Sequence, residues 1–251
     1  MKVFAWKINL KKTKNIKKNK KINKFNINLI IFAMLLTVFA FSYAGGTLQV
    51  FNKTNGESAI YQGNTLSNNI SLMINVYWGD EFLKPMLETL NNAGVKTTFF
   101  VGGVWASKNA DMLNLILSYG NELANHGYYH KDSNKISEVE NFNEISQTHQ
   151  IVKSLTGIEM SLFAPPSGAY NQTTVNVAAS LGYKTIMWTR DTIDWRDKDE
   201  NLIYSRAVKD AKGGDLVLMH PTECTKNALP KIIATLQDKG LNITTVSETL
   251  A

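Results

Sequence analysis

Apolar stretches alternate with amphipathic stretches along the chain from residue 70 onwards. Short apolar runs typical of buried strands precede longer runs in which apolar residues recur every three or four positions. The predicted strands span residues 71–78, 95–103, 122–127, 160–166, 183–189 and 214–220. The predicted helices span residues 81–94, 106–120, 139–157, 171–182, 200–211 and 225–240, and residues 242–250 close the chain. About seven such units predict a parallel sheet with helices outside it, either open or closed into a barrel.

The N-terminal part of the chain has a different pattern. Residues 1–28 contain ten lysines and no acidic residue, and an apolar segment runs from Leu29 to Tyr43. These fifteen residues are fewer than the roughly 20 that a membrane-spanning helix needs. Ser42 and Ala44 place small residues where a signal peptidase requires them. Residues 1–44 are therefore predicted to be a basic arm followed by a signal peptide, or by an uncleaved anchor.

Both interpretations place the rest of the protein outside the cytoplasm. We expect it to be exported, either secreted or anchored to the outer face of the cytoplasmic membrane, with membrane contact only through residues 29–44. Residues 45–67 are rich in Gly, Asn, Ser and Thr, which predicts a linker or an entry hairpin. Residues 68–251 are long enough for one domain with its own core.

Composition narrows the possible functions. The net charge of +6 comes from the basic arm, because the remaining chain has 17 basic and 21 acidic residues. The sequence therefore indicates no nucleic-acid surface. Cys224 is the only cysteine, so a disulfide framework is excluded and a metal could be bound only by histidines and carboxylates. Neither G-x-G-x-x-G nor a P-loop follows the first predicted strand, which argues against a nucleotide site.

Histidines and aspartates follow several predicted strands where those strands end. They are Asp80, His126, His130, Asp191, Asp194 and His220. The carboxyl ends of parallel strands meet at one edge of a sheet, so we expect these side chains to lie close together. Two histidines four positions apart, with a carboxylate from a neighbouring strand, could bind a catalytic metal ion. Two solvated histidines on a surface turn would give the same spacing.

Five short motifs occur in order within residues 58–250: INVYWGDE, NHGYYH, FAPPSGAY, DTIDW and LVLMH. Together they resemble the polysaccharide deacetylases, the NodB-homology or carbohydrate esterase family 4 group, and most closely their sporulation-associated branch in Gram-positive bacteria. The resemblance implies a distorted (β/α) barrel with about seven parallel strands, here as a monomer. It also implies a hydrolase that removes N-acetyl groups from peptidoglycan, spore-cortex or chitin-like polysaccharide with the help of a divalent metal ion, most often zinc.

The resemblance assigns roles to individual residues. His126 and His130 match the two metal-binding histidines, His220 matches the acid that protonates the leaving amine, and Asp194 matches the residue that orients that histidine. The residues matching the substrate pocket are Pro165, Pro166, Tyr170, Trp195 and Leu218.

The first and third motifs depart from the family pattern. The family's T-F-D-D is Met73-Ile74-Asn75-Val76 here, so Asn75 occupies the base position and Val76 the usual position of the metal-binding Asp. Asp80, in the following Trp-Gly-Asp, is therefore assigned as the metal carboxylate. The arginine that begins the third motif is Ala164.

The loss of the aspartate at position 75 is physically consistent with the loss of the arginine at position 164. An asparagine has no charge for a buried arginine to pair with, and an unpaired buried guanidinium is costly. An amide cannot accept a proton, and general-base help contributes about 10²–10⁴-fold to a rate. Three hypotheses follow: an impaired deacetylase in which Asp191 or Asp80 could replace the base, a glycan-binding pseudoenzyme, and a purely structural exported barrel.

Overall fold

The computed structural model describes residues 57–251, together with residues 32, 33 and 36, which are helical. The chain divides into two compact units, Met1–Val50 and Phe51–Ala251. The predicted basic arm, the apolar segment except for those three residues, and most of the predicted linker lie outside the described residues. None of the helices in the described part combines the length and apolar character needed to cross a membrane.

Every strand pair in the second unit is parallel. The strand order is β5-β4-β3-β2-β1-β7-β6, and β8 pairs with the start of β1. The strands are β1 (Asn69–Val76), β2 (Thr98–Val101), β3 (Glu122–Asn125), β4 (Leu162–Phe163), β5 (Lys184–Thr185), β6 (Arg190–Asp191), β7 (Leu216–Met219) and β8 (Asn242–Ile243). The predicted distorted barrel is confirmed: the seven strands of the main path form a curled half-barrel surrounded by helices.

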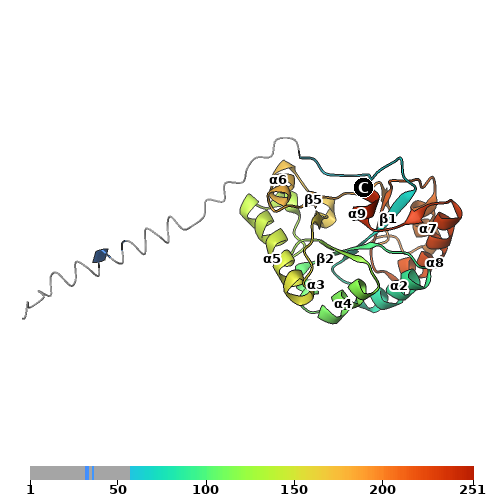
Figure 1. Cartoon of the computed structure of the whole chain (residues 1–251), viewed down its shortest axis with the longest axis horizontal. Helices are drawn as coiled ribbons and strands as arrows, with labels where there is room; N and C mark the ends of the chain where they lie inside the picture. Colours follow the sequence, from blue (N-terminus) through green and yellow to red (C-terminus); the bar gives the residue numbers. More distant parts are fainter. Residues whose placement is uncertain (1–31, 34–35, 37–56) are drawn as a thin grey trace, which may run out of the picture. The chain divides into compact units, whose positions relative to one another are not determined.

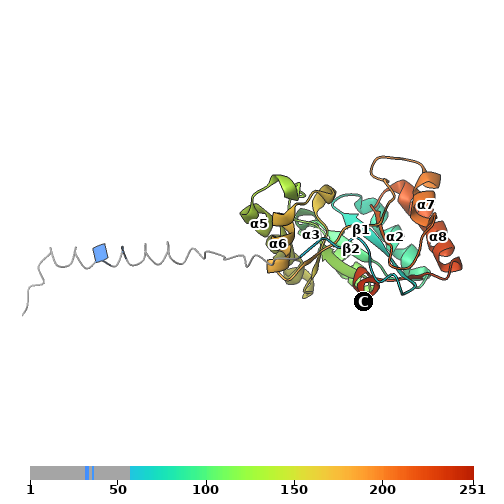
Figure 2. The ribbon, with the colours of Figure 1, turned by 90° about the horizontal axis from the view of Figure 1, so that it is seen from above.

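The helices lie around this sheet, with α5 and α6 on one side and α7 and α8 on the other (Figure 1; Figure 2). They are α2 (Asp80–Asn92), α3 (Gly103–Ala106), α4 (Ala110–Ser118), α5 (Glu138–Thr156), α6 (Gln172–Ser180), α7 (Glu200–Val208), α8 (Glu223–Asp238) and α9 (Val246–Leu250). Two short 3₁₀ turns, Ser133–Lys135 and Pro166–Gly168, lie in the loops after β3 and β4.

The strand predicted over residues 183–189 is shorter in the structure, because only β5 lies within it and β6 begins just beyond its end. β5 pairs with β4, and β6 pairs with β7 on the opposite edge of the sheet. One continuous segment, Lys184–Asp191, therefore joins both edges, with a bend at Thr189. Ile60, within the predicted linker, pairs with Ile186 on this segment. The Trp188 side chain lies at the end of the sheet where the strands terminate.

Alternation along β1 separates two hydrophobic clusters. Ile70, Leu72, Ile74 and Val76 belong to the large cluster between the sheet and the helices. Met73 belongs to a smaller cluster inside the curl of the sheet, with Phe100, Ala124, Leu162, Ala164, Ile186, Leu216 and Val246. Side chains alternate between faces along a strand, so Asn75 follows Met73 on the inner face. Burying one large aliphatic side chain contributes about 1.5–3 kcal/mol, which fixes this register.

Candidate functional site

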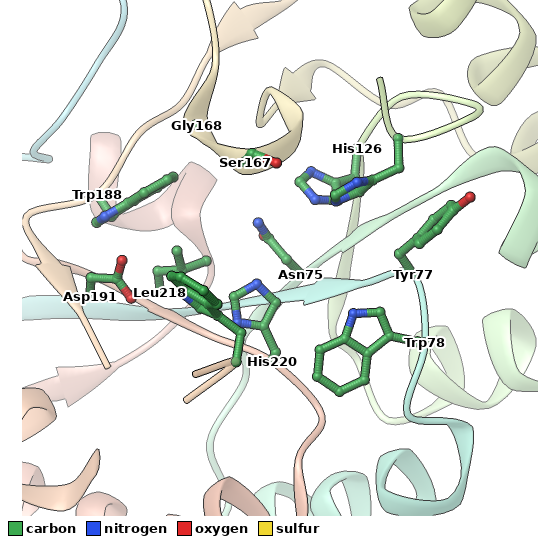
Figure 3. Close-up of a pocket in the computed structure, with 12 residues that line it drawn as sticks. Asn75, Tyr77, Trp78, His126, Ser167, Gly168, Trp188, Asp191, Leu218 and His220 are labelled. Carbon is green, nitrogen blue, oxygen red and sulfur yellow. The ribbon is translucent and has the colours of Figure 1, made fainter. Parts of the chain in front are cut away.

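A cavity of about 360 Å³ opens at the carboxyl ends of the strands (Figure 3). Every loop that contributes to it follows a strand of the curled sheet, as parallel topology predicts. Its lining consists of Asn75, Tyr77, Trp78, His126, His130, Ser167, Gly168, Trp188, Asp191, Trp195, Leu218 and His220. We call it the strand-end pocket.

His126 directly follows β3 and is almost completely buried. Its Nδ1 lies 2.8 Å from the carbonyl oxygen of Ala164. A carbonyl can only accept, so Nδ1 donates and the neutral ring keeps a lone pair on Nε2. Burial, and then the neighbouring His130 ring, lowers the pKa of His126 to about 3. The ring is therefore neutral at physiological pH.

His130 lies beside His126, with 5.0 Å between the ring centroids. The His130 ring also stacks on Tyr77, with 4.7 Å between the ring centroids, and its backbone has a φ of 58° in the left-handed region. Burial lowers the pKa of His130 as well. The two histidines thus face the same cavity, rather than extending from a solvated turn.

The structure leaves Asp80 outside the lining of the pocket that holds these histidines, and its role as the third metal ligand stays a prediction. Gly79 has a φ of 83° and turns the chain away from β1, and Asp80 becomes the first residue of α2. The Asp80 carboxylate accepts a hydrogen bond from the indole nitrogen of Trp105 and faces a neighbouring cavity of about 380 Å³. Throughout the described part of the chain, no group of three or more His, Cys, Asp or Glu side chains could hold a metal ion.

Gly79 also allows the first and last motifs to meet. A Cβ on Gly79 would lie 2.1 Å from the carbonyl oxygen of Pro221, which follows His220. Only glycine tolerates both this approach and the positive φ. The glycine of the Trp-Gly-Asp motif therefore positions the His220 loop against the end of β1.

The buried Asp194 carboxylate pairs with the partly exposed His220 ring at one side of the pocket. Nδ1 of His220 lies 2.8 Å from Oδ1 of Asp194, and the backbone N–H of His220 donates to Oδ2 over 2.6 Å. The Thr225 hydroxyl, from the first turn of α8, donates to the same Oδ2 over 2.5 Å. A carboxylate with three donors holds His220 so that Nε2 is the ring nitrogen left for the pocket.

The loop carrying Asp194 is strained. Ile193 has a φ of 54°, and its N–H donates to the Asp191 carboxylate over 2.8 Å. Arg206 of α7 donates to the Thr192 carbonyl and pairs with Asp197. Within the described residues, four non-glycine positions have positive φ, and His130, Ser167 and Ile193 all lie in or beside the pocket. Strain of this kind is concentrated at functional sites.

The floor of the pocket carries an amide where the family has a carboxylate. Asn75 is 4% exposed, and its Oδ1 has no hydrogen-bond partner among the residues that the structure describes. Ala164 is fully buried in the inner cluster, and Val76 is fully buried in the outer one. The side chains at these three positions therefore offer neither a base, nor its arginine partner, nor a metal-binding carboxylate.

Tryptophans give the pocket flat apolar walls. Trp78 and Trp195 are 45% and 57% exposed, and the Trp78 ring lies nearly parallel to that of His220. Trp188 contacts Gly168 so closely that a Cβ there would lie 2.6 Å from the indole. Exposed aromatic faces beside polar groups are suited to a ligand with both apolar and hydroxyl-bearing faces, such as a pyranose.

The site residues predicted from sequence fall into two groups. Asn75, His126, His130, Trp195, Leu218 and His220 line the pocket, with Asp194 directly behind His220. Asp80, Pro165, Pro166 and Tyr170 are not among its lining residues, and Tyr170 instead bonds to the Tyr61 hydroxyl. Tyr77, Trp78, Ser167, Gly168 and Trp188 line the pocket without having been predicted as site residues. The first four lie within recognised motifs, whereas Trp188 had no signal apart from its position in an apolar run.

Comparison with known families identifies the class of protein. The polysaccharide deacetylase family model matches residues 62–186. A peptidoglycan-N-acetylglucosamine deacetylase of Bacillus cereus is 31% identical over 175 residues, covering 67% of this chain and 82% of that protein. The chain therefore belongs to the polysaccharide deacetylase family, whose enzymes are generally metal-dependent. The uncharacterized protein YlxY of Bacillus subtilis is 35% identical over 75% of this chain, which spans 59% of YlxY.

Solved structures include relatives that have lost activity. A carbohydrate esterase family 4 pseudoenzyme from Bacillus anthracis has a TM-score of 0.76 and 34% identity, with 78% of this chain and 70% of that chain covered. A mutant of it, described as having restored enzymatic activity, matches with a TM-score of 0.76 and 32% identity over 78% of this chain and 72% of the other. The family fold thus occurs in both active and inactive proteins.

Proposed function

We propose that this protein binds N-acetylated cell-wall glycan in the strand-end pocket and hydrolyses it weakly or not at all. One observation carries the proposal: the inward-facing residue at the end of β1 is Asn75, whose amide has no proton-accepting group to activate water. The pocket keeps the aromatic walls that would bind a sugar.

The metal-binding groups support the same conclusion. His126 and His130 offer neutral imidazoles to one cavity, as a zinc site requires. A catalytic zinc ion needs three protein ligands, and Asp80 faces a different cavity. The residues present therefore fit an incomplete set, and metal-dependent hydrolysis as in the family's enzymes is not expected.

The nature of the glycan is inferred from relatives. Several curated relatives are named as peptidoglycan deacetylases acting on N-acetylglucosamine or N-acetylmuramic acid units. The predicted export of the chain would place the pocket beside this polymer. A cell-wall or spore-cortex glycan is accordingly the proposed ligand, and fractionation of intact cells with an antibody against residues 57–251 would test the location.

A second candidate function is slow hydrolysis with Asp191 as a substitute base. Asp191 lines the pocket, and its carboxylate is oriented by the Ile193 N–H. If this reaction occurs, Asp191→Asn abolishes acetate release, whereas Asp238→Asn, on the exposed end of α8, leaves it unchanged.

The decisive experiment restores, in steps, the residues that the family's enzymes have at these positions. Asn75→Asp with Ala164→Arg restores the base and its partner, and Val76→Asp adds the carboxylate at the family's metal position. We expect the double variant with zinc to release acetate from N-acetylglucosamine oligomers faster than the wild type, and the triple variant to be faster again. A general base increases the reaction rate by about 10²–10⁴-fold. Wild-type activity equal to that of both repaired variants would contradict the proposal.

The single variants serve as matched controls. Asn75→Asp alone buries an unpaired carboxylate, and Ala164→Arg alone buries an unpaired guanidinium. We expect each single change to destabilise the fold by roughly 3 kcal/mol or more, and the pair to recover part of this loss. Additive losses would mean that the two side chains do not meet.

A further inference from the structure

A chain of hydrogen bonds runs from the exposed side of α5 to the loop after β3. His149 of α5 lies with Nε2 2.7 Å from the Glu159 carboxylate and with Nδ1 2.5 Å from the Tyr183 hydroxyl. The Tyr183 hydroxyl accepts from Nδ2 of Asn125 over 3.4 Å, and Oδ1 of Asn125 accepts from the backbone N–H of Gly127 over 2.9 Å. We call the side chains of Glu159, His149, Tyr183 and Asn125 the α5 relay.

Each bond in the α5 relay has one direction. The Glu159 carboxylate can only accept, so Nε2 of His149 donates to it and, in the neutral ring, Nδ1 keeps a lone pair. The Tyr183 hydroxyl therefore donates to Nδ1. Burial raises the pKa of Tyr183 to about 12, so the hydroxyl keeps its proton at physiological pH. Its oxygen is then left to accept from Asn125.

This direction selects the orientation of the Asn125 amide. Nδ2 donates to the Tyr183 hydroxyl and, over 2.8 Å, to the Ile145 carbonyl, which leaves Oδ1 for the Gly127 N–H. The reversed amide would set an NH₂ group against an N–H and an oxygen against a carbonyl. Asn125 is fully buried and Tyr183 is nearly so. Water therefore does not replace a lost partner, and each broken bond leaves a costly unpaired group.

The Gly127 N–H belongs to the peptide group that follows His126. Gly127 has a φ of 74°, and its bond to Asn125 holds this peptide plane beside the imidazole that lines the pocket (Figure 3). Two residues further on, the N–H of Tyr129 donates to the buried Glu144 carboxylate of α5 over 2.8 Å. The loop is thus held to α5 at two points, through Asn125 and through Glu144.

Building on the proposed function, we propose that His149 is a positioning residue for the strand-end pocket. Through Tyr183 and Asn125 it sets the peptide plane beside His126, and so places the imidazoles of this loop for a bound sugar. No member of the α5 relay lines the pocket, so His149 acts on the ligand only through this backbone. Loss of the Nδ1 acceptor lets the Tyr183 hydroxyl and then the Asn125 amide turn, and the Gly127 N–H loses its fixed acceptor.

Matched variants separate positioning from general stability. His149→Leu and Tyr183→Phe break the α5 relay, whereas His149→Asn places an oxygen acceptor near the position of Nδ1. The first control is Gln150→Leu, at the exposed neighbour of His149 on α5. The second is Tyr119→Phe, because the Tyr119 hydroxyl forms no hydrogen bond within the described part of the chain.

Two quantities are measured on the full chain labelled with ¹⁵N, after a melting curve has shown that each variant is folded. They are the NMR signal of the Gly127 amide and the affinity for N-acetylglucosamine tetramer by calorimetry. The His149 side chain is 24% exposed, so His149→Leu decides the question if Tyr183→Phe does not fold.

We expect His149→Leu and Tyr183→Phe to shift the Gly127 signal and to weaken tetramer binding about tenfold, the scale of one hydrogen bond. We expect His149→Asn and both controls to bind like the wild type. A lowered melting temperature with unchanged Gly127 signal and affinity would mean that the α5 relay only stabilises the fold, and would overturn the proposal. A shifted Gly127 signal with unchanged affinity would overturn it as well.

Failure of the wild type to bind the tetramer is a separate outcome. It would overturn the proposed function, and with it the effect of His149 on binding. The Gly127 signal would still show whether the α5 relay holds the loop.

Discussion

Asp194 accepts two hydrogen bonds from His220, one from the ring and one from the backbone, and is fully shielded from solvent. The pair is retained although the base at position 75 is absent. The Thr225 hydroxyl is the third donor to the Asp194 carboxylate and links the pair to α8. The arrangement therefore contributes to stability as well as to the pocket.

The first prediction concerns this pair. Asp194→Asn replaces an acceptor-only carboxylate by an amide, so at least one of the three donors loses its partner. We expect the free energy of unfolding to fall by roughly 2 kcal/mol or more, the scale of a hydrogen bond to a charged group. Thr225→Val should cost about 1 kcal/mol. Urea denaturation measures both, and equal stability of Asp194→Asn and the exposed control Asp238→Asn would contradict the account.

The second prediction concerns pH. The folded-state pKa of His126 is about 3, and its ordinary value is 6.5. Between these values the unfolded chain binds a proton that the folded chain does not, so stability falls as the pH falls below 6.5. For metal-free protein we expect this group to contribute a loss of roughly 2–3 kcal/mol between pH 6.5 and pH 4.5.

His126→Asn isolates this contribution. The asparagine NH₂ can still donate to the Ala164 carbonyl, but it does not titrate. Denaturant midpoints at both pH values should therefore show a flatter dependence in the variant, although carboxylates elsewhere titrate equally in both proteins. The same slope in both would mean that His126 is charged in the folded state.

The third prediction concerns metal removal. Because the two imidazoles lack a third ligand, chelation should leave the melting temperature unchanged, and zinc should raise it by less than about 2 °C. At a free zinc concentration of 100 times its Kd, a tight site would stabilise the fold by about 2.7 kcal/mol. This stabilisation would raise the melting temperature by several degrees. Tight 1:1 zinc binding that disappears in His130→Ala would show that a third ligand reaches the ion.

The fourth prediction compares two glycines. Gly79 and Gly94 both have positive φ, but a Cβ on Gly79 would meet Pro221, whereas a Cβ on Gly94 would meet no atom within 4 Å. Gly94→Ala should therefore cost only about 1 kcal/mol of backbone strain, and Gly79→Ala clearly more. Thermal melting of the two variants, with glycan binding as a second readout, distinguishes them. Equal losses would mean that the β1–α2 and β7–α8 loops do not depend on this contact.

Much of the fold follows from the apolar pattern. The strand–helix alternation predicts the parallel sheet, and β1 already shows its two faces in the contrast between Ile74 and Asn75. Periodicity does not predict the curl of the sheet, in which one short segment runs from β5 on one edge to β6 on the other, because residues 183–189 are a mostly apolar run typical of a single strand.

The sequence predicted the pocket residues correctly where a motif lies at the end of a strand. It did not do so where a turn changes the direction of the chain. His126 and His220 directly follow strands, His130 lies further along the loop after β3, and all three line the pocket. Asp80 is four residues beyond β1, and the left-handed turn at Gly79 carries it into α2. Sequence proximity could not reveal this change of direction. Pro165 and Pro166 shape the loop after β4 without reaching the pocket lining.

The central claim, glycan binding with little or no hydrolysis, is tested most directly by recovering the ligand after it has bound. The wild-type chain is titrated with N-acetylglucosamine tetramer in the presence of zinc, and the tetramer is then released and weighed by mass spectrometry. We predict saturable binding and acetyl loss that is absent or far slower than in the triple variant Asn75→Asp, Val76→Asp and Ala164→Arg. Acetyl loss by the wild type as fast as by the triple variant, and abolished by His220→Ala, would contradict the account.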